Sequence, residues 1–162
     1  MNHDRRTFLT AAGLGGLAVT VGCAPTESQA AQKFEFTLTD AEWRKRLSPA
    51  AYQTLRHAAT ERPFTSPLNS EHRAGVFACA GCALPLFSSD TKFDSGTGWP
   101  SFWAPLNNAV VTKTDRALGM SRTEVLCRRC GGHLGHVFDD GPQPTGKRYC
   151  MNGVAMTFKP KA

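Results

Sequence analysis

Six cysteines carry the most evident chemistry of this 162-residue sequence. Four of them form two CxxC pairs, Cys79 with Cys82 and Cys127 with Cys130. Two such pairs, well separated along a chain, can bind one zinc ion through four thiolates, which leaves the ion no open position for water or substrate. Two disulfides are the alternative in an exported protein, but a disulfide inside a CxxC pair is usually redox-active. We therefore predict a structural zinc site.

A fifth cysteine, Cys150, lies outside both pairs and has polar neighbours in the sequence. A single cysteine is most often a small buried hydrophobic residue. Here, however, Arg148 can stabilise a thiolate, and Asn152 can donate hydrogen bonds to a polar oxygen. His133 and His136 lie in a glycine-rich segment, which we interpret as a hairpin, and can supply protons or charge. The sequence therefore favours Cys150 as an activated nucleophile.

Trp99 lies in a run, residues 95–102, that is too rich in glycine and proline to form a regular element. An indole on such a loop either covers the hydrophobic core or forms one wall of a pocket for an apolar group. The residues alone leave both roles open.

The elements that must position these side chains are mostly strands. Thr39 to Glu42 form a capping box, and Ser48-Pro49 offers a second helix start, so two short helices are expected first. Beyond residue 67 the chain changes to β-type runs that are separated by glycine and proline. These runs cover residues 75–78, 108–112, 121–126, 136–138 and 154–158. We predict a mainly β fold of the α+β class, with antiparallel strands and a small helical N-terminal part.

Residues 1–30 have the pattern of a twin-arginine export signal, in which Arg5 and Arg6 precede an uncharged stretch of glycine, alanine and leucine. Cleavage before Ala31 would leave residues 31–162 as one domain, which we expect to be a periplasmic monomer. The alternative is a membrane-anchored lipoprotein that keeps a lipid on Cys23. The twin-arginine route carries folded protein, so zinc would bind before export.

The net charge of +6 does not by itself identify a partner. Positive side chains are dispersed along the chain, and nucleic-acid binding would require clustered Lys and Arg or stacking aromatic residues. We therefore expect no nucleic-acid partner. A zinc-ribbon binding module and a redox-sensing module without turnover remain as alternatives to an enzyme.

Long motifs in the same order make the chain from about residue 34 to 160 resemble the B-type peptide methionine sulfoxide reductases. The segments that match are residues 61–64, 79–82, 92–102, 124–142 and 144–152. The resemblance implies a β-tent-like pair of antiparallel sheets, a structural zinc on the four paired cysteines, and Cys150 as the nucleophile. It also implies reduction of the R epimer of methionine sulfoxide in oxidised proteins or peptides.

On this reading the Cys150 thiolate attacks the sulfoxide sulfur, with His136 as the acid that meets the oxygen. His133 and Asn152 orient and polarise the substrate, and the resemblance implies that Trp99 holds its methyl group. Methionine then leaves, and Cys150 remains as a sulfenic acid. Three further substrate-binding or thiolate-tuning candidates are Phe138, Asp140 and Arg148.

Two positions depart from the family pattern. Many relatives carry a resolving cysteine two residues before the tryptophan, where this chain has Thr97. An external thiol, such as a thioredoxin-like protein, is therefore expected to reduce the oxidised Cys150. The second departure is Gly153, where the family usually has serine, and this puts one secondary hydrogen bond in doubt.

Overall fold

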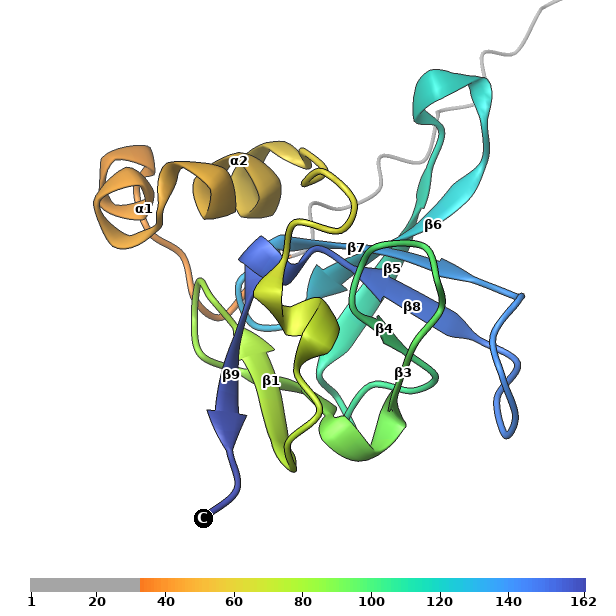
Figure 1. Cartoon of the computed structure of the whole chain (residues 1–162). Coiled ribbons are helices and arrows are strands. Elements are labelled where there is room, and N and C mark those ends of the chain that lie inside the picture. Colours follow the sequence, from red (N-terminus) through yellow and green to blue (C-terminus); the bar gives the residue numbers. More distant parts are fainter. Residues whose placement is uncertain (1–32) are drawn as a thin grey trace, which may run out of the picture. The chain divides into compact units, whose positions relative to one another are not determined.

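The computed structural model describes residues 33–162 of the chain, which form two short helices followed by two antiparallel sheets (Figure 1). The predicted signal, residues 1–30, and Cys23 lie outside the described residues. Among the residues from 33 onward, no helix is both long and apolar enough to cross a membrane. The prediction of a mainly β fold with two antiparallel sheets is confirmed.

Both helices start where the sequence predicts. Helix α1 spans Asp40–Arg46, and the capping box between Thr39 and Glu42 is formed in both directions. Helix α2 spans Pro49–His57, with the Ser48 hydroxyl accepting a hydrogen bond from the third residue of the helix. Each helix buries one side, through Trp43 of α1 and Leu55 of α2, among others.

The smaller sheet has three strands in the order β2-β1-β9, and the larger has six in the order β3-β4-β8-β7-β6-β5. The strands of the smaller sheet are β1 (Gly75–Cys79), β2 (Pro85–Ser88) and β9 (Met156–Pro160). Those of the larger sheet are β3 (Lys92–Phe93), β4 (Ser101–Phe102), β5 (Val110–Asp115), β6 (Arg122–Cys127), β7 (His133–Phe138) and β8 (Arg148–Met151).

An aromatic cluster joins the two sheets. Phe87 of β2 stacks on Phe102 of β4 with ring centroids 4.4 Å apart, and Phe77 of β1 meets Phe102 edge-on at 4.9 Å. All three rings are fully buried. Such pairs stabilise a core through their large apolar area and their preferred ring geometry. The core therefore lies between the sheets, where its rings fix one sheet against the other.

Several sequence-based boundaries change in the structure. Strand β5 starts at Val110 rather than at residue 108, and residues 153–155 form a short 3-10 segment before β9. The hairpin interpretation of the histidine segment agrees with the structure, because β6 and β7 pair antiparallel across the connection at residues 128–132, and both His133 and His136 belong to β7. Strand β8, which contains Cys150, was not predicted.

Candidate active site

A row of chemically active side chains crosses the larger sheet. Cys150 of β8 pairs in register with His136 of β7 on one side and with Ser101 of β4 on the other. His136 pairs in turn with Glu124 of β6, which pairs with Lys113 of β5. Residues directly opposite one another in an antiparallel sheet point to the same face and lie in side-chain contact range. Five strands therefore deliver these side chains to one face.

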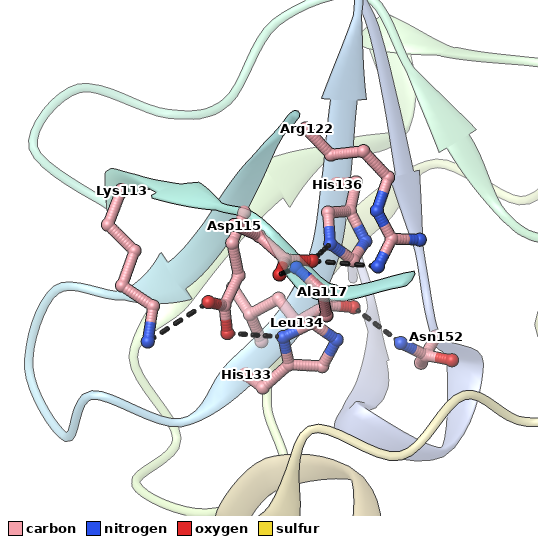
Figure 2. A network of polar contacts seen from close by, with 9 residues as sticks. Lys113, Asp115, Ala117, Arg122, His133, Leu134, His136 and Asn152 are labelled. Carbon is pink, nitrogen blue, oxygen red and sulfur yellow. Dashed lines mark hydrogen bonds and ion pairs between the residues drawn. The ribbon is translucent and has the colours of Figure 1, made fainter. Parts of the chain in front are cut away.

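A β-bulge brings the second histidine to that face as well. Residues three apart on a regular strand point to opposite sides, so His133 and His136 would be separated by the sheet. The register between β6 and β7 shifts at Leu134, which has no partner residue and turns into the core. One extra residue reverses the alternation of side chains. As a result the two histidine rings lie 5.4 Å apart (Figure 2).

A buried carboxylate fixes the ring of His133. Its Nδ1 lies 2.6 Å from Glu124 Oε1, and Lys113 Nζ lies 3.0 Å from the other oxygen of the same carboxylate. The His133 side chain is only 4% exposed. Its Nε2 is buried and makes no hydrogen bond with any residue from 33 to 162. The ring is therefore held in one orientation, with its second nitrogen enclosed by the surrounding protein.

A second carboxylate, Asp115, fixes His136. Its Oδ2 lies 2.9 Å from His136 Nε2 and also accepts a hydrogen bond of 2.7 Å from Arg122 (Figure 2). Bonds from the Ala117 backbone N–H and from His136 hold the pKa of Asp115 well below its usual range. Burial lowers the pKa of His136, and the Asp115 bond only partly opposes this shift. At neutral pH the imidazole is therefore mainly neutral and able to accept a proton.

The sulfur of Cys150 opens into a cavity of about 140 Å³. Five of the sequence-predicted site residues line it, namely Trp99, His136, Phe138, Cys150 and Asn152. Thr60, Arg122 and Gly135 complete the wall. One part of the wall has apolar rings, and another part has a thiol and an imidazole. Such a cavity suits a small group that is apolar at one end and polar at the other.

The protonation of Cys150 reflects opposing influences. Burial raises the pKa of its thiol, while the Thr97 hydroxyl, 3.8 Å from the sulfur, and the Arg148 guanidinium act to lower it. The burial effect is the larger, so the thiol form dominates in the free protein. A base close to the sulfur is therefore needed to produce the reactive thiolate. His136 pairs with Cys150 across β7 and β8 and lines the same cavity, so it is the candidate for that base.

Arg148 and Asp140 form an ion pair beside this cavity rather than within its wall. Two parallel hydrogen bonds of 2.9 Å join them, and the Asp140 side chain is 63% exposed. The guanidinium also lies 4.4 Å above the ring of Phe138. Arg148 thus fixes the orientation of an aromatic wall in addition to its effect on the thiol.

The segment around Glu61 ties two parts of the cavity together. Its backbone N–H donates to Asn152 Oδ1 at 2.9 Å, and its carbonyl accepts from Trp99 Nε1 at 3.1 Å. Its carboxylate accepts from the backbone N–H groups of Gly153 and Val154. Asn152 Nδ2 also donates to the Leu134 carbonyl at 3.1 Å (Figure 2). The orientations of the indole and of the amide are therefore both set by Glu61.

Ser66 occupies the space in which a side chain at position 153 would lie. A Cβ atom built on Gly153 would come within 1.8 Å of Ser66 Oγ and 2.6 Å of Ser66 Cβ. Ser66 is itself buried and accepts a hydrogen bond from the Leu68 N–H. The serine that the family usually carries at position 153 therefore does not fit beside Ser66. A hydroxyl group is still present there, supplied by the neighbouring loop.

The four paired cysteines gather in a separate buried cluster, and their four sulfur atoms all lie within 4.8 Å of one another. Cys79 Sγ is 3.7 Å from Cys130 Sγ, and Cys82 Sγ is 3.5 Å from Cys127 Sγ. A tetrahedral ion with metal–sulfur bonds of about 2.3 Å places its sulfur ligands about 3.8 Å apart. These distances match a four-thiolate metal site and are far too long for disulfide bonds.

Comparison with known proteins agrees with this geometry. Residues 47–160 match the family model described as the SelR domain. The chain belongs to the SelR domain family. It is 56% identical over 131 residues to a protein of Pseudomonas putida W619 named "Peptide methionine sulfoxide reductase MsrB", covering 80% of this chain and 97% of that one. Proteins with the same name from Thiobacillus denitrificans and Leptospira interrogans are 57% and 50% identical, over 76% and 78% of this chain and 94% and 97% of theirs.

The SelR domain residues that sequence reasoning missed are partners of the histidines rather than groups with a motif of their own. Asp115 lies 21 positions from His136, and Glu124 lies nine positions from His133. Both are acidic residues on strands, and such residues are too common to indicate a functional role in a single sequence. The available signal was the strand register, because pairing the 121–126 run with the histidine strand places Glu124 opposite His136.

Proposed function

We propose that this protein reduces the R epimer of methionine sulfoxide in oxidised polypeptides to methionine, with Cys150 as the nucleophile. The observation that carries the proposal is the cavity in which the Cys150 thiol meets His136 and the rings of Trp99 and Phe138. Methionine sulfoxide has a polar oxygen and an apolar methyl group on one sulfur, and the cavity wall has matching polar and apolar parts. The names of the SelR relatives point to the same substrate.

The reaction needs the thiol proton to move before the sulfur can attack. Neutral His136 takes the proton from Cys150, which gives a thiolate and an imidazolium whose charge Asp115 balances. The thiolate attacks the sulfoxide sulfur, and the imidazolium returns the proton to the developing oxyanion. The bond between the two sulfurs and the substrate S–O bond then break as the hydroxyl group passes to Cys150, which ends as S–OH, and methionine leaves with the electron pair on its sulfur. Thiol and sulfoxide thus become sulfenic acid and thioether, with all atoms and electrons balanced.

The remaining residues orient the substrate in this scheme. Asn152 uses one amide hydrogen on Leu134, which leaves the second for the sulfoxide oxygen. Trp99, held by its bond to the Glu61 carbonyl, forms the apolar wall for the methyl group. His133 does not line the cavity; it is fixed by Glu124 and packs edge-on against the His136 ring, which it helps to hold in place. Groups already fixed in place lose little freedom when the transition state forms.

We also propose that the thiolate cluster binds zinc and that the ion is structural. Cys79 lies at the end of β1 and Cys127 at the end of β6, so one ion would join the two sheets. Four sulfur ligands leave no position for substrate, and such sites contribute folding free energy.

Recycling and location complete the proposal. Thr97 replaces a resolving cysteine, so a thioredoxin-like thiol would reduce the Cys150 sulfenic acid directly. The protein would act as a monomer, exported to the periplasm by the twin-arginine route; a lipid anchor on Cys23 is the alternative.

A thioredoxin-coupled assay on the separate R and S epimers of N-acetyl-methionine sulfoxide tests the function. We expect NADPH oxidation with the R epimer only, and bound zinc in about a 1:1 ratio by metal analysis. Turnover of the S epimer alone, or absence of turnover, would refute the proposed function.

A further inference from the structure

Among the residues whose exposure the structure describes, Phe64 is the most exposed large hydrophobic side chain, with 74% of its surface in contact with solvent. Its backbone also has a left-handed conformation, with φ of 63°. A bulky residue with positive φ is a rare outlier that costs of order 1–3 kcal/mol, and such strain gathers at functional sites. A ring so exposed gains little burial in the free protein to offset this cost. The combination points to a contact made with a ligand.

Two hydrogen bonds attach the Phe64 segment to the loop that carries Trp99. The Phe64 N–H donates to the Gly98 carbonyl at 2.8 Å, and Trp99 Nε1 donates to the Glu61 carbonyl at 3.1 Å. A Cβ atom on Gly98 would lie 2.9 Å from the Phe64 ring, so only glycine allows the ring to rest there. Phe64 is therefore a rigid part of the active-site rim.

The Trp99 side of this rim borders a second cavity of about 230 Å³. Its wall contains the aromatic residues Phe64, Phe93 and Trp99 and a larger set of polar and charged residues, namely Asn69, Ser70, His72, Lys92 and Asp94. Trp99 also lines the cavity that holds Cys150, so the two cavities adjoin at this residue. A polypeptide bound in the first cavity therefore has the second cavity as its neighbour on the Trp99 side.

We propose that Phe64 and this second cavity bind the residue next to the methionine sulfoxide in an extended polypeptide, with a preference for an apolar side chain. This inference rests on the proposed function. The sulfoxide side chain fills the Cys150 cavity, so the flanking residues must lie on its rim. An apolar neighbour covers the exposed Phe64 ring, and the polar wall suits peptide groups. Because the ring is already fixed, binding orders few further groups.

Three substrates test the proposal in the coupled assay with the full domain. The first is the R epimer of N-acetyl-methionine sulfoxide. The second is a blocked pentapeptide with leucine on both sides of the sulfoxide residue, and the third is the same peptide with serine in place of both leucines. Phe64→Asn removes the ring, and asparagine tolerates the left-handed conformation. We expect the ratio of kcat/KM for the leucine peptide to that for N-acetyl-methionine sulfoxide to fall by about tenfold. The same ratio for the serine peptide should change by less than about threefold.

Two further variants separate ring contact from other effects. Phe64→Tyr keeps the ring and should hold the leucine ratio within about twofold of the parent. Met120→Asn is the matched control, because Met120 is also an exposed large hydrophobic residue, at 53%, but lies beyond β5 outside both cavities. This variant should leave kcat/KM unchanged for all three substrates.

An unchanged leucine ratio in Phe64→Asn, an equal loss on all three substrates, or an equal loss in Met120→Asn would overturn the inference. In each of these cases, parental turnover of N-acetyl-methionine sulfoxide would leave the proposed function standing. If the parent protein fails to reduce that compound, the proposed function fails, and this inference fails with it.

Discussion

A side chain at position 153 should destabilise the protein because Ser66 occupies its place. In Gly153→Ser, the new Cβ would lie 1.8 Å from Ser66 Oγ, a separation that real structures do not contain. Relief requires a backbone shift, which would also weaken the bond from the Gly153 N–H to Glu61. Overpacking of this kind costs about 1–3 kcal/mol, and the charge-assisted bond contributes about 1.5–3 kcal/mol. We expect a loss of about 2–4 kcal/mol in the free energy of unfolding.

Urea unfolding followed by tryptophan fluorescence measures this loss as a lower midpoint at unchanged slope. A second variant, Ser66→Gly, removes both atoms that obstruct position 153, at the cost of the bond to Leu68, about 1 kcal/mol. The double variant should then be more stable than Gly153→Ser alone. Neighbouring residues of this kind couple by about 0.5–3 kcal/mol. Strictly additive losses in the two single variants would refute the steric reasoning.

Four further outcomes follow from the site. Cys150→Ser should abolish sulfoxide reduction in the coupled assay and keep zinc content and circular dichroism at parental values, whereas Cys127→Ser should lose the metal and unfold. His136→Ala should lower kcat by about 10²- to 10⁴-fold, with an unchanged thermal midpoint as its control for folding. Because burial raises the pKa of Cys150, the rate of its alkylation by iodoacetamide should keep rising with pH from neutrality to above about pH 9. A plateau of this rate near neutral pH would contradict the prediction. On oxidation by methionine sulfoxide the parent should give a dimedone adduct at Cys150, and Thr97→Cys should instead give a disulfide by peptide mapping.

The parts of the fold that the sequence predicts are those governed by local interactions. The capping box at Thr39 and the proline after Ser48 specify the two helix starts within a few residues. The β4 strand, Ser101–Phe102, is too short to show alternation, and it is defined only by its pairing with β3 and β8. Local patterns are therefore informative for long or capped elements and silent for short strands.

The same distinction holds for the site. Cys150 and the CxxC pairs were recognisable because their chemistry depends on residue type and spacing. Glu61 contacts Asn152 across 91 positions of sequence through its backbone N–H, and its carboxylate accepts hydrogen bonds from the backbone of Gly153 and Val154. Contacts of this kind follow from tertiary packing, and no pattern in one sequence specifies them.

The bulge at Leu134 makes the site sensitive to the relative lengths of strands β6 and β7. Inserting one residue between Val125 and Leu126 would give Leu134 a partner, and the strands could still pair, since backbone hydrogen bonding does not depend on residue type. The insertion would, however, restore the regular alternation along β7 and turn either His133 or His136 away from Cys150. A substitution at Leu134 alters packing, whereas this insertion removes one ring from the site. Mutational tolerance in this strand pair is therefore governed by changes of length more than by amino-acid exchange.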